Sequence, residues 1–355
     1  MTVHNIIANR YEIKRPIGSG GMQDVYLAFD SVLESLVALK TPQAGQADKR
    51  FNQSAIIAGR VNHHNVAKTF DYFEFEEKPY LIEEFVEGIN LEEKLKLFGA
   101  VDPHLSARIF LHIAKGLAAS HHAGVVHRDL KPSNIIVEPG INLHQLKITD
   151  FGIATLTADV FDEAASNGGD LTRSTSGTIK GALPYMAPEM MFRAPGEHPG
   201  KSSDIWSLGA LMFRIMTGEL PFGVYLQAAV NVKTKDRKPW PFFMTQNPQF
   251  KSLAIRLQHI VDKCLDYDPK QRPSADELVA EISDLCFIGV DRVEGKVEKY
   301  ITSRSGFIRG ADNEVSFFSV DSRYGSAKPD QNQRVCYSRF PGSPRTRAHP
   351  IILLK

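Results

Sequence analysis

The pattern of apolar and polar positions divides the chain into a strand-rich first part and a helix-rich second part. Up to Val86 apolar and polar residues mostly alternate, as in half-buried strands, and glycines and turn residues separate the runs. The clearest runs are residues 11–17, 24–30 and 36–40. From Asn90 onward the apolar residues recur at helical spacing, most clearly in residues 104–122, 202–217 and 249–265. We therefore predict an α+β fold with a small β-rich lobe over about residues 11–86 and a larger α-rich lobe over about residues 90–287.

Two segments depart from this division. Residues 48–61 have apolar residues at helical spacing, which predicts a helix inside the β-rich lobe. Residues 166–178, with the sequence SNGGDLTRSTSGT, are polar and rich in Gly, Ser and Thr. This composition predicts a long loop in the α-rich lobe.

The strand-like run that ends at Val86 contains two consecutive glutamates, Glu83 and Glu84, in the sequence LIEEF. Because successive side chains of a strand point to opposite faces, Glu83 must share a face with Leu81 and Phe85. Burying a carboxylate is costly unless a cation pairs with it. The pattern thus raises the question of a partner for Glu83, and the alternatives are that its carboxylate extends to solvent or is protonated.

Helical periodicity is lost after residue 290, and the charge changes sign. Residues 290–355 hold twelve Lys and Arg against seven Asp and Glu, a net charge of +5, whereas residues 1–289 carry −4. The stretches AKPDQNQR and FPGSPRTRAHP resemble linker, yet the segment also contains seven aromatic residues, which is unusual for a disordered tail. We expect short strands or docking contacts here, and we predict that this segment docks on the acidic remainder of the chain and modulates it.

Composition and charge indicate an ordinary soluble protein. The net charge of the 355 residues is +1, so no global field favours a nucleic-acid or membrane partner. The three cysteines are far apart and form no CxxC or zinc pattern, which fits a reducing compartment. The N-terminus lacks the apolar core of a signal peptide, and no apolar run is long enough to span a membrane. We therefore expect a cytoplasmic protein without nucleic-acid or membrane partners.

Six short motifs that can carry chemistry follow one another along the chain. They are IGSGGMQDVYLA at 17–28, VALK ending at Lys40, VHRDLKPSNII at 126–136, DFG at 150–152, YMAPE ending at Glu189 and SSDIWSLG at 202–209. A glycine-rich turn between strands lets backbone N–H groups approach a phosphate. The third motif can bring together a base, a cation and a metal ligand in Asp129, Lys131 and Asn134, and Asp150 supplies a second metal-binding carboxylate. Each motif could occur by accident, whereas all six in this order could not.

With these motifs the chain resembles the eukaryotic-like (Hanks-type) Ser/Thr protein kinases, especially their bacterial branch. The resemblance covers roughly residues 11–287, through the sequence DPKQRPSADEL. It implies a two-lobed protein-kinase fold, preceded by an N-terminal segment of residues 1–10 and followed by a basic C-terminal extension of residues 288–355. It also implies transfer of the γ-phosphate of ATP, with Mg²⁺, to Ser and Thr hydroxyls of protein substrates.

Position by position, the resemblance also implies a nucleotide site. Ile17 belongs to this site, and the ATP phosphates are covered by Gly18, Ser19, Gly20 and Gly21. The adenine is enclosed by Val25, Ala38 and Ile136, and its edge is hydrogen-bonded by the backbones of Glu84 and Val86. Glu83 occupies the gatekeeper position at the back of the adenine pocket, where the family normally has an apolar residue. Lys40 holds the α- and β-phosphates.

The resemblance further implies catalytic, structural and regulatory roles. Asp129 accepts the proton of the substrate hydroxyl or orients that hydroxyl, Lys131 contacts the γ-phosphate, and Asn134 and Asp150 hold Mg²⁺. Glu189 and Arg272 form a structural ion pair, and Asp204 bonds the backbone of the catalytic loop. Arg128 docks a phosphorylated activation loop, in which Ser174, Thr175, Ser176 and Thr178 are available for autophosphorylation, a reaction that self-association could support.

Three positions depart from the family pattern. Gln23 replaces the third glycine of the glycine-rich loop, and Ala182 replaces a threonine that bridges the catalytic aspartate and lysine. Ser54 replaces the helix glutamate that pairs with the strand lysine, and no other acidic residue lies between Phe51 and Phe70. Because a carboxylate has been lost beside Lys40 and another gained at Glu83, we predict that Glu83 is the substitute partner of Lys40.

Two alternatives remain open at this point. The first is a pseudokinase, a nucleotide-binding scaffold or regulator without phosphoryl transfer, although Asp129, Asn134 and Asp150 are all retained. The second is a kinase of the same fold that acts on a non-protein acceptor. The APE segment and the Ser/Thr-rich loop argue against the second alternative.

Overall fold

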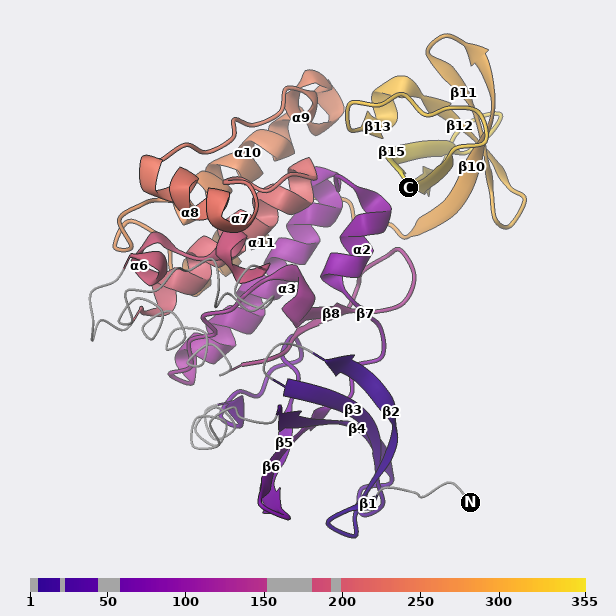
Figure 1. Cartoon of the computed structure of the whole chain (residues 1–355). Helices are drawn as coiled ribbons and strands as arrows, with labels where there is room; N and C mark the ends of the chain where they lie inside the picture. Colours follow the sequence, from indigo (N-terminus) through magenta and orange to yellow (C-terminus); the bar gives the residue numbers. More distant parts are fainter. Residues whose placement is uncertain (1–5, 20–22, 44–57, 152–180, 193–198) are drawn as a thin grey trace.

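The structure is a computed structural model of the whole chain, and it describes residues 6–19, 23–43, 58–151, 181–192 and 199–355. Three parts follow one another along the molecule: an N-terminal β-sheet, a helical body in the middle and a second β-structure beyond it (Figure 1). The two β-structures lie at opposite ends of the helical body.

The N-terminal sheet has six antiparallel strands in the order β1-β2-β3-β4-β6-β5. Their bounds are β1 Ile6–Ile7, β2 Tyr11–Ser19, β3 Gln23–Asp30, β4 Ser35–Pro42, β5 Thr69–Phe75 and β6 Lys78–Glu84. Apolar residues of alternate positions form the core of this sheet, among them Tyr11, Val37, Leu39 and Ile82. The three predicted strands are confirmed, whereas β6 ends two residues before Val86. Most of the helix predicted for residues 48–61 lies outside the described residues.

The body packs its helices around one large apolar core that includes Phe110, Trp206 and Phe213. Its helices are α2 Leu91–Phe98, α3 Pro103–His122, α6 Pro188–Met191, α7 Lys201–Thr217, α8 Tyr225–Thr234, α9 Phe243–Gln246, α10 Pro248–Cys264 and α11 Ala275–Ser283. A small sheet of β7 Ile89–Asn90, β8 Ile135–Val137 and β9 Leu146–Ile148 faces the N-terminal sheet. The three long helices predicted from the apolar spacing are α3, α7 and α10, each correct to within a residue or so at both ends.

Caps explain where two of these helices begin and end. The side chain of Asp102 accepts a hydrogen bond from the His104 N–H and so caps the first turn of α3 (3.1 Å), and Pro103 fits the first helical position. Helix α7 ends at Gly218, whose φ of 78° lies in the left-handed region that glycine adopts without strain.

The C-terminal segment forms a closed β-barrel. Its strands are β10 Arg292–Thr302, β11 Ser305–Gly310, β12 Val315–Ser319, β13 Arg323–Tyr324, β14 Arg334–Phe340 and β15 Arg347–Leu353. The order β12-β11-β10-β14-β15 closes on itself because β12 also pairs with β15. Inward-pointing residues form a separate core that includes Val297, Phe318 and Tyr337. The expectation of short strands is confirmed, but the linker interpretation of FPGSPRTRAHP is wrong from Arg347 onward, where β15 begins. Two prolines and a glycine precede this strand and conceal it, although β15 is buried on both faces, with Ile351 in the barrel core and Ile352 in the core of the body.

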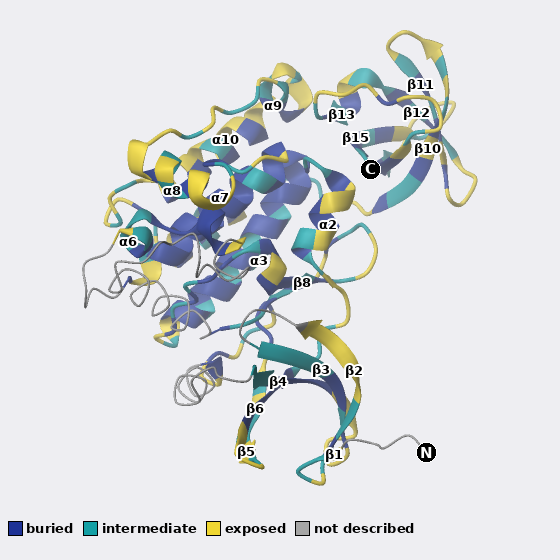
Figure 2. Cartoon of the chain, in the orientation of Figure 1, coloured by how far each residue is buried: buried dark blue, intermediate teal, exposed yellow. Residues whose placement is uncertain are grey.

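The barrel packs directly on the helical body, and Figure 2 shows buried residues on both sides of this contact, here called the seam. Four barrel residues complete the core of the body: Tyr324, Cys336, Ile352 and Leu354. The Tyr324 hydroxyl donates to the Met216 carbonyl (2.9 Å), and Arg292 forms a buried ion pair with Asp102 (2.7 Å). The predicted docking is therefore present in the structure. It rests on apolar contact and one buried ion pair rather than on a diffuse attraction between oppositely charged surfaces, and modulation by the barrel stays a prediction.

Candidate active site

Lys40 and Glu83 lie on one face of two paired strands. In the register of β4 and β6, Lys40 lies opposite Leu81, and Ala38 lies opposite Glu83. Directly opposed residues of an antiparallel pair point to the same face, so all four share a face and the two charged residues are diagonal neighbours. Long side chains span that diagonal distance, and both residues are only 4% exposed. The alternation in LIEEF thus gave the correct face for Glu83.

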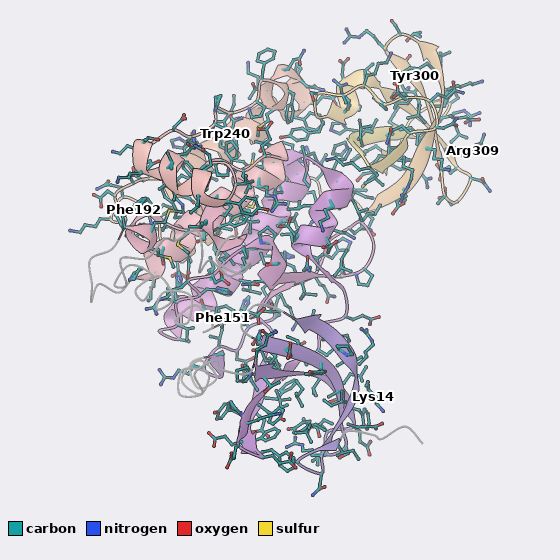
Figure 3. The ribbon with its side chains drawn as sticks, viewed as in Figure 1. Lys14, Phe151, Phe192, Trp240, Tyr300 and Arg309 are labelled. Carbon is teal, nitrogen blue, oxygen red and sulfur yellow. The ribbon has the colours of Figure 1, made fainter. Side chains whose placement is uncertain are left out.

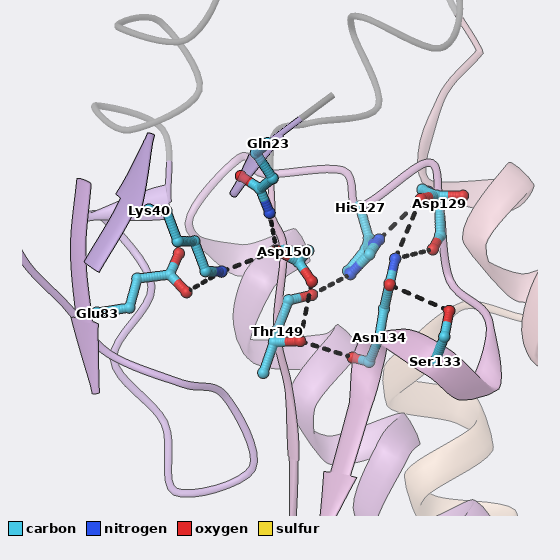
Figure 4. Close-up of polar contacts among 9 residues, drawn as sticks. All are labelled: Gln23, Lys40, Glu83, His127, Asp129, Ser133, Asn134, Thr149 and Asp150. Carbon is cyan, nitrogen blue, oxygen red and sulfur yellow. Dashed lines mark hydrogen bonds and ion pairs between the residues drawn. The ribbon is translucent and has the colours of Figure 1, made fainter. Parts of the chain in front are cut away.

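The ammonium of Lys40 contacts two carboxylates. One is Glu83, through Oε2, and the other is Asp150, whose Oδ1 is 2.7 Å from Lys40 Nζ (Figure 4). Glu83 comes from the N-terminal sheet, whereas Asp150 follows β9 of the body, so Lys40 links the two lobes. The predicted ion pair between Lys40 and Glu83 is present. Ser54, the position that lost its carboxylate, lies outside the described residues.

The pKa directions agree with a charged cluster. Burial alone would lower the pKa of Lys40, but the charges and hydrogen bonds of Asp150 and Glu83 outweigh this effect and raise it. Burial raises the pKa of Glu83, which Lys40 offsets only in part. Burial would also raise the pKa of Asp150, but the charge of Lys40 and hydrogen bonds from Lys40 and Gln23 lower it. One ammonium between two carboxylates leaves net negative charge, which favours additional cations.

Asp204 holds the catalytic loop in place. Its buried carboxylate accepts hydrogen bonds from the backbone N–H groups of His127 (2.8 Å) and Arg128 (2.7 Å) and from the ring of His121 (2.9 Å). Arg128 has a φ of 62°, a strained value for a residue with a Cβ. The charge-assisted bond from Asp204 stabilises this turn, as expected for Asp204 from the family resemblance.

Three residues of the catalytic loop form one hydrogen-bonded group. Lys131 Nζ lies 2.7 Å from Asp129 Oδ2. The side-chain amide of Asn134 donates to both the carbonyl (2.9 Å) and Oδ2 (3.1 Å) of Asp129, as Figure 4 shows. With Ala182 in place of the bridging threonine, the lysine and the aspartate make this contact directly. The amide nitrogen of Asn134 is thereby occupied, whereas its oxygen accepts only a long hydrogen bond from the Ser133 hydroxyl (3.4 Å) among the described residues, so a lone pair remains for a cation.

Asp150 is held beside this group by the backbone of Thr149, the residue that follows β9. The Thr149 N–H donates to the Asn134 carbonyl (2.9 Å), and the His127 ring donates to the Thr149 carbonyl (3.0 Å). Asp150 itself has a φ of 63°, in the left-handed region that aspartate tolerates better than most residues. These contacts join the catalytic loop and the DFG motif into one unit (Figure 4).

The sequence did not predict a role for Gln23 at this site. Its side-chain amide donates to Asp150 Oδ1 (2.9 Å), the same oxygen that Lys40 contacts. The two residues are 127 positions apart in sequence. The only available signal was the absence of the third glycine, which indicated an unusual loop but not a partner.

Several of the nucleotide-site positions that the resemblance implied lie on strands. Val25 is on β3 opposite Lys40 of β4, and Ile136 is on β8. The Glu84 N–H is already donated to the Lys68 carbonyl (2.8 Å), so Glu84 can offer adenine only its own carbonyl. The Glu84 side chain pairs with Lys147. Ile17 and Gly18 belong to β2, whereas Gly20 and Gly21 lie outside the described residues.

The structure describes one of the predicted regulatory residues. Arg128 is half-buried, and its Nε is buried without a hydrogen-bond partner in the described part of the chain. Ser174, Thr175, Ser176 and Thr178 lie outside the described residues. The predicted structural ion pair between Glu189 and Arg272 is present. The Nη1 and Nη2 atoms of Arg272 donate to the two carboxylate oxygens of Glu189 (2.7 and 2.9 Å). A fork of this kind is the strongest form of ion pair.

A comparison with known protein families matches residues 11–282 to the protein kinase domain. The chain belongs to the protein kinase family. This confirms the predicted family, and the N-terminal sheet and helical body confirm the two-lobed kinase fold. In the residues that the structure describes, no helix is both long and apolar enough to cross a membrane.

Three curated proteins similar to this chain are bacterial kinases. The serine/threonine-protein kinase PrkC of Bacillus subtilis (strain 168) is 32% identical over 289 residues, which cover 79% of this chain and 41% of PrkC. The serine/threonine-protein kinase pkn2 of Myxococcus xanthus is 34% identical over 77% of this chain and 32% of its own. The serine/threonine-protein kinase PknB of Mycobacterium tuberculosis (strain ATCC 25618 / H37Rv) is 30% identical over 79% and 44%, respectively. The chain thus spans less than half the length of these relatives.

Proposed function

We propose that the chain is an ATP- and Mg²⁺-dependent kinase that phosphorylates Ser and Thr hydroxyls of proteins. The observation that carries this proposal is the convergence of Asp129, Lys131 and Asn134 with the Lys40–Asp150 contact in one hydrogen-bonded region, of which Figure 4 shows all but Lys131. Phosphoryl transfer needs positioning and charge neutralisation more than covalent chemistry from the protein. A cluster of two lysines, two carboxylates and an amide oxygen provides both.

The residues fit Mg²⁺ and ATP. Mg²⁺ prefers hard oxygen ligands, keeps several waters and usually takes only one or two protein carboxylates besides phosphate oxygens. Asp150 and the amide oxygen of Asn134, which accepts one long hydrogen bond from Ser133 and keeps a second lone pair, match that demand. Within the described residues no cluster of three or more His, Cys, Asp or Glu is arranged to hold a metal, which fits a site that the nucleotide completes. When bound, Mg²⁺ would neutralise the phosphate charge.

Each side chain then has a specific task. Lys40, kept charged by its two carboxylates, would bind the α- and β-phosphates. Asp129 would orient the acceptor hydroxyl and take its proton, and Lys131 would contact the γ-phosphate. The backbone bonds to Asp204 hold this loop in place before substrate arrives, so little reorganisation is needed during transfer.

We further propose that Glu83 replaces the helix carboxylate missing at Ser54. The family normally positions its strand lysine with a glutamate from a helix, whereas here the carboxylate comes from β6, the strand beside Lys40. Because β6 is hydrogen-bonded to β4, Glu83 cannot move independently of Lys40, whereas a glutamate on a separate helix can. This pairing would therefore persist whether or not the lobes close.

Incubation of the purified protein with radiolabelled ATP and Mg²⁺, with and without casein as a generic acceptor, tests the proposal. Label on Ser or Thr that is absent in Asp129→Asn supports it. A protein that binds Mg-ATP but transfers no label to itself or to casein would instead be the pseudokinase of the alternative hypothesis. Label on a small molecule alone would exclude a protein kinase.

We also propose autophosphorylation within residues 172–178. The support is Arg128, which is half-buried beside Asp129 with a guanidinium Nε that lacks a described partner. A phosphate would give it charge-assisted hydrogen bonds. Phosphosite mapping after incubation with Mg-ATP should find a modified Ser or Thr in this segment, at a rate that depends on protein concentration if self-association is required. An unmodified segment in protein that labels casein contradicts this proposal.

A further inference from the structure

The outer surface of the barrel carries an unusual cross-strand row. In the registers of β10, β11, β12 and β15, Lys299 lies opposite Phe307, Phe307 opposite Phe317, and Phe317 opposite Arg347. Directly opposed residues share a face, and their strand neighbours Gly306, Ile308 and Phe318 point into the barrel core. The row is therefore on the outside, where the two phenylalanines remain half-buried.

Three cations surround these two rings. The Arg347 guanidinium lies 4.5 Å from the centroid of Phe317, and Arg345 and Lys299 lie 5.5 and 6.0 Å from that of Phe307. The two ring centroids are themselves 6.2 Å apart. All three cations are exposed. Cation–π contact of this kind limits the freedom of a long side chain and holds its charge over the ring. We call Lys299, Phe307, Phe317, Arg345 and Arg347 the basic row.

No described carboxylate neutralises these three cations. Six of the seven acidic side chains of the barrel pair elsewhere: Asp291 with His144, Glu294 with Arg334, Glu298 with Arg309, Asp312 and Glu314 with Arg339, and Asp321 with Arg304. Within the described residues, Arg345, Arg347 and Lys299 form no ion pair, and Arg347 donates only to the Ser343 carbonyl (3.3 Å). Much of the barrel's excess positive charge is thus concentrated in one patch.

We propose that the basic row binds a phosphorylated segment of a protein. Two guanidinium groups can each offer a planar fork of donors, and a phosphate brings about −1.5 to −2 charges with three acceptor oxygens. A single carboxylate offers one charge and two oxygens, so it would satisfy this patch less well.

The geometry favours a phosphoprotein over single-stranded nucleic acid. Bases bind such proteins by stacking on open aromatic faces. Here the cations lie over the rings, which positions them for anions and leaves less ring surface for a base. The β11–β12 hairpin also lies on the side of the barrel remote from α3, at the margin where Arg309 is labelled (Figures 1 and 3). A partner there would be held by the barrel without covering the catalytic cleft.

Binding of labelled peptide libraries to the full chain, without nucleotide, tests this inference independently of the transfer reaction. The probe is a degenerate pool of nine-residue peptides with a central phosphoserine, compared with pools that carry serine or glutamate at that position. Fluorescence anisotropy should give at least about tenfold tighter binding of the phosphoserine pool. The double substitution Arg345→Ala/Arg347→Ala should weaken it by about tenfold or more, and Phe317→Leu by about threefold.

The matched control is Arg304→Ala, which removes an exposed barrel arginine that is already paired with Asp321. It should change binding less than about twofold. Equal losses in this control and in the double variant would mean diffuse attraction to a basic domain and would overturn the proposal. So would tighter binding of a labelled oligothymidylate than of the phosphoserine pool, or no preference for phosphoserine over glutamate. Equal melting temperatures of all variants show that the barrel is intact.

Discussion

Two buried charge clusters join separate parts of this kinase, and they differ in how their charge is balanced. In the cleft, one lysine, Lys40, contacts the carboxylates of Glu83 and Asp150. At the seam, Arg292 contacts Asp102, whose other oxygen caps helix α3 through the His104 N–H. The first cluster has an excess of negative charge, whereas the second is neutral and tied into a helix end.

This difference separates a cluster whose charge would be balanced by a bound cation from one whose charges already cancel. Excess negative charge in a buried cleft is unfavourable until a cation arrives, which favours the metal ion that would accompany the nucleotide. The charges of Asp102 and Arg292 cancel each other, although Asp102 Oδ2 and Arg292 Nη1 form no hydrogen bond with the described residues, and the apolar residues Tyr324 and Ile352 pack around the same seam. We therefore expect substitutions in the cleft to change activity more than stability, and substitutions at the seam to do the reverse.

The largest expected effect is at the seam. Arg292→Met leaves Asp102 as a buried carboxylate without its cation, and breaking such a pair typically costs about 3–5 kcal/mol. The free energy of unfolding in urea should fall by about 3 kcal/mol, while kcat/KM at 20 °C, measured well below the unfolding temperature, stays within about threefold of wild type.

The control is Arg334→Met, which breaks the exposed barrel pair with Glu294. Exposed pairs contribute about 1 kcal/mol or less, so its effect on unfolding should be small. An equal loss in both variants would show that the seam pair is not special. A large loss of kcat/KM in folded Arg292→Met would show that the barrel regulates catalysis through this contact.

The second effect is at the cleft. Glu83→Met restores an apolar gatekeeper but removes one of the two carboxylates that hold Lys40. If about 3 kcal/mol of the pairing is expressed in the transition state, kcat/KM falls about a hundredfold, with a much smaller change in melting temperature. Steady-state kinetics with Mg-ATP and a peptide substrate measure this, beside thermal unfolding of the same preparations.

Adding Ser54→Glu provides the rescue. If the carboxylate is what Lys40 requires, Glu83→Met/Ser54→Glu should regain much of the lost activity, and the double-mutant cycle should show strong coupling. Wild-type kcat/KM in Glu83→Met alone would disprove the relocation of the partner. An inactive double variant with normal nucleotide affinity would mean that position 83 acts in some other way.

Elements and contacts could be predicted from the sequence where they depend on residues close together in the chain, and not where they join residues that are far apart. Strands β2 to β4 and helices α3, α7 and α10 follow from local periodicity, and the face of β6 that carries Glu83 follows from strand alternation. The closure of the barrel does not, because β12 and β15 pair across about thirty intervening positions with a single direct register contact, Phe317 to Arg347. The hydrogen bond between Gln23 and Asp150 likewise forms only in the folded chain, and no short-range sequence pattern predicts it.

Acidic pH should weaken the seam by a smaller amount. His349 stacks on Phe250 with ring centroids 5.2 Å apart, and burial, together with the nearby His104, lowers its pKa to about 4. Its unfolded value is about 6.5, so the folded state excludes a proton that the unfolded state takes up. Stability is therefore full above pH 6.5 and declines as the pH falls from 6.5 toward 4.

Because His349 is partly exposed, we expect about 1–2 kcal/mol of destabilisation between pH 7.5 and pH 5 from this residue. Melting temperatures in the two buffers measure it. His349→Phe should keep the stacking and reduce the pH dependence, and its tolerance is expected because Nδ1 of His349 has no described hydrogen-bond partner. The exposed His259→Gln serves as the control. The same pH dependence in His349→Phe as in wild type would place the sensitive group elsewhere, with His104, whose pKa burial also lowers, as the next residue to test.

The smallest expected effect concerns Gln23, which shares Asp150 Oδ1 with Lys40. If Asp150 binds Mg²⁺, the amide of Gln23 competes for one of its oxygens, whereas no comparable competitor acts on the neutral seam pair. Gln23→Ala should therefore lower the KM for Mg²⁺ by about threefold, less than 1 kcal/mol, with kcat within about twofold. Gln23→Gly removes the same amide and also restores the family's glycine, so any further change in kcat reports on loop flexibility alone. A higher KM for Mg²⁺ in Gln23→Ala would mean that Gln23 helps to orient Asp150 for the metal. The side chains of the cleft would then be held in place before the metal binds, as the residues of the seam are, despite the excess negative charge of the cleft.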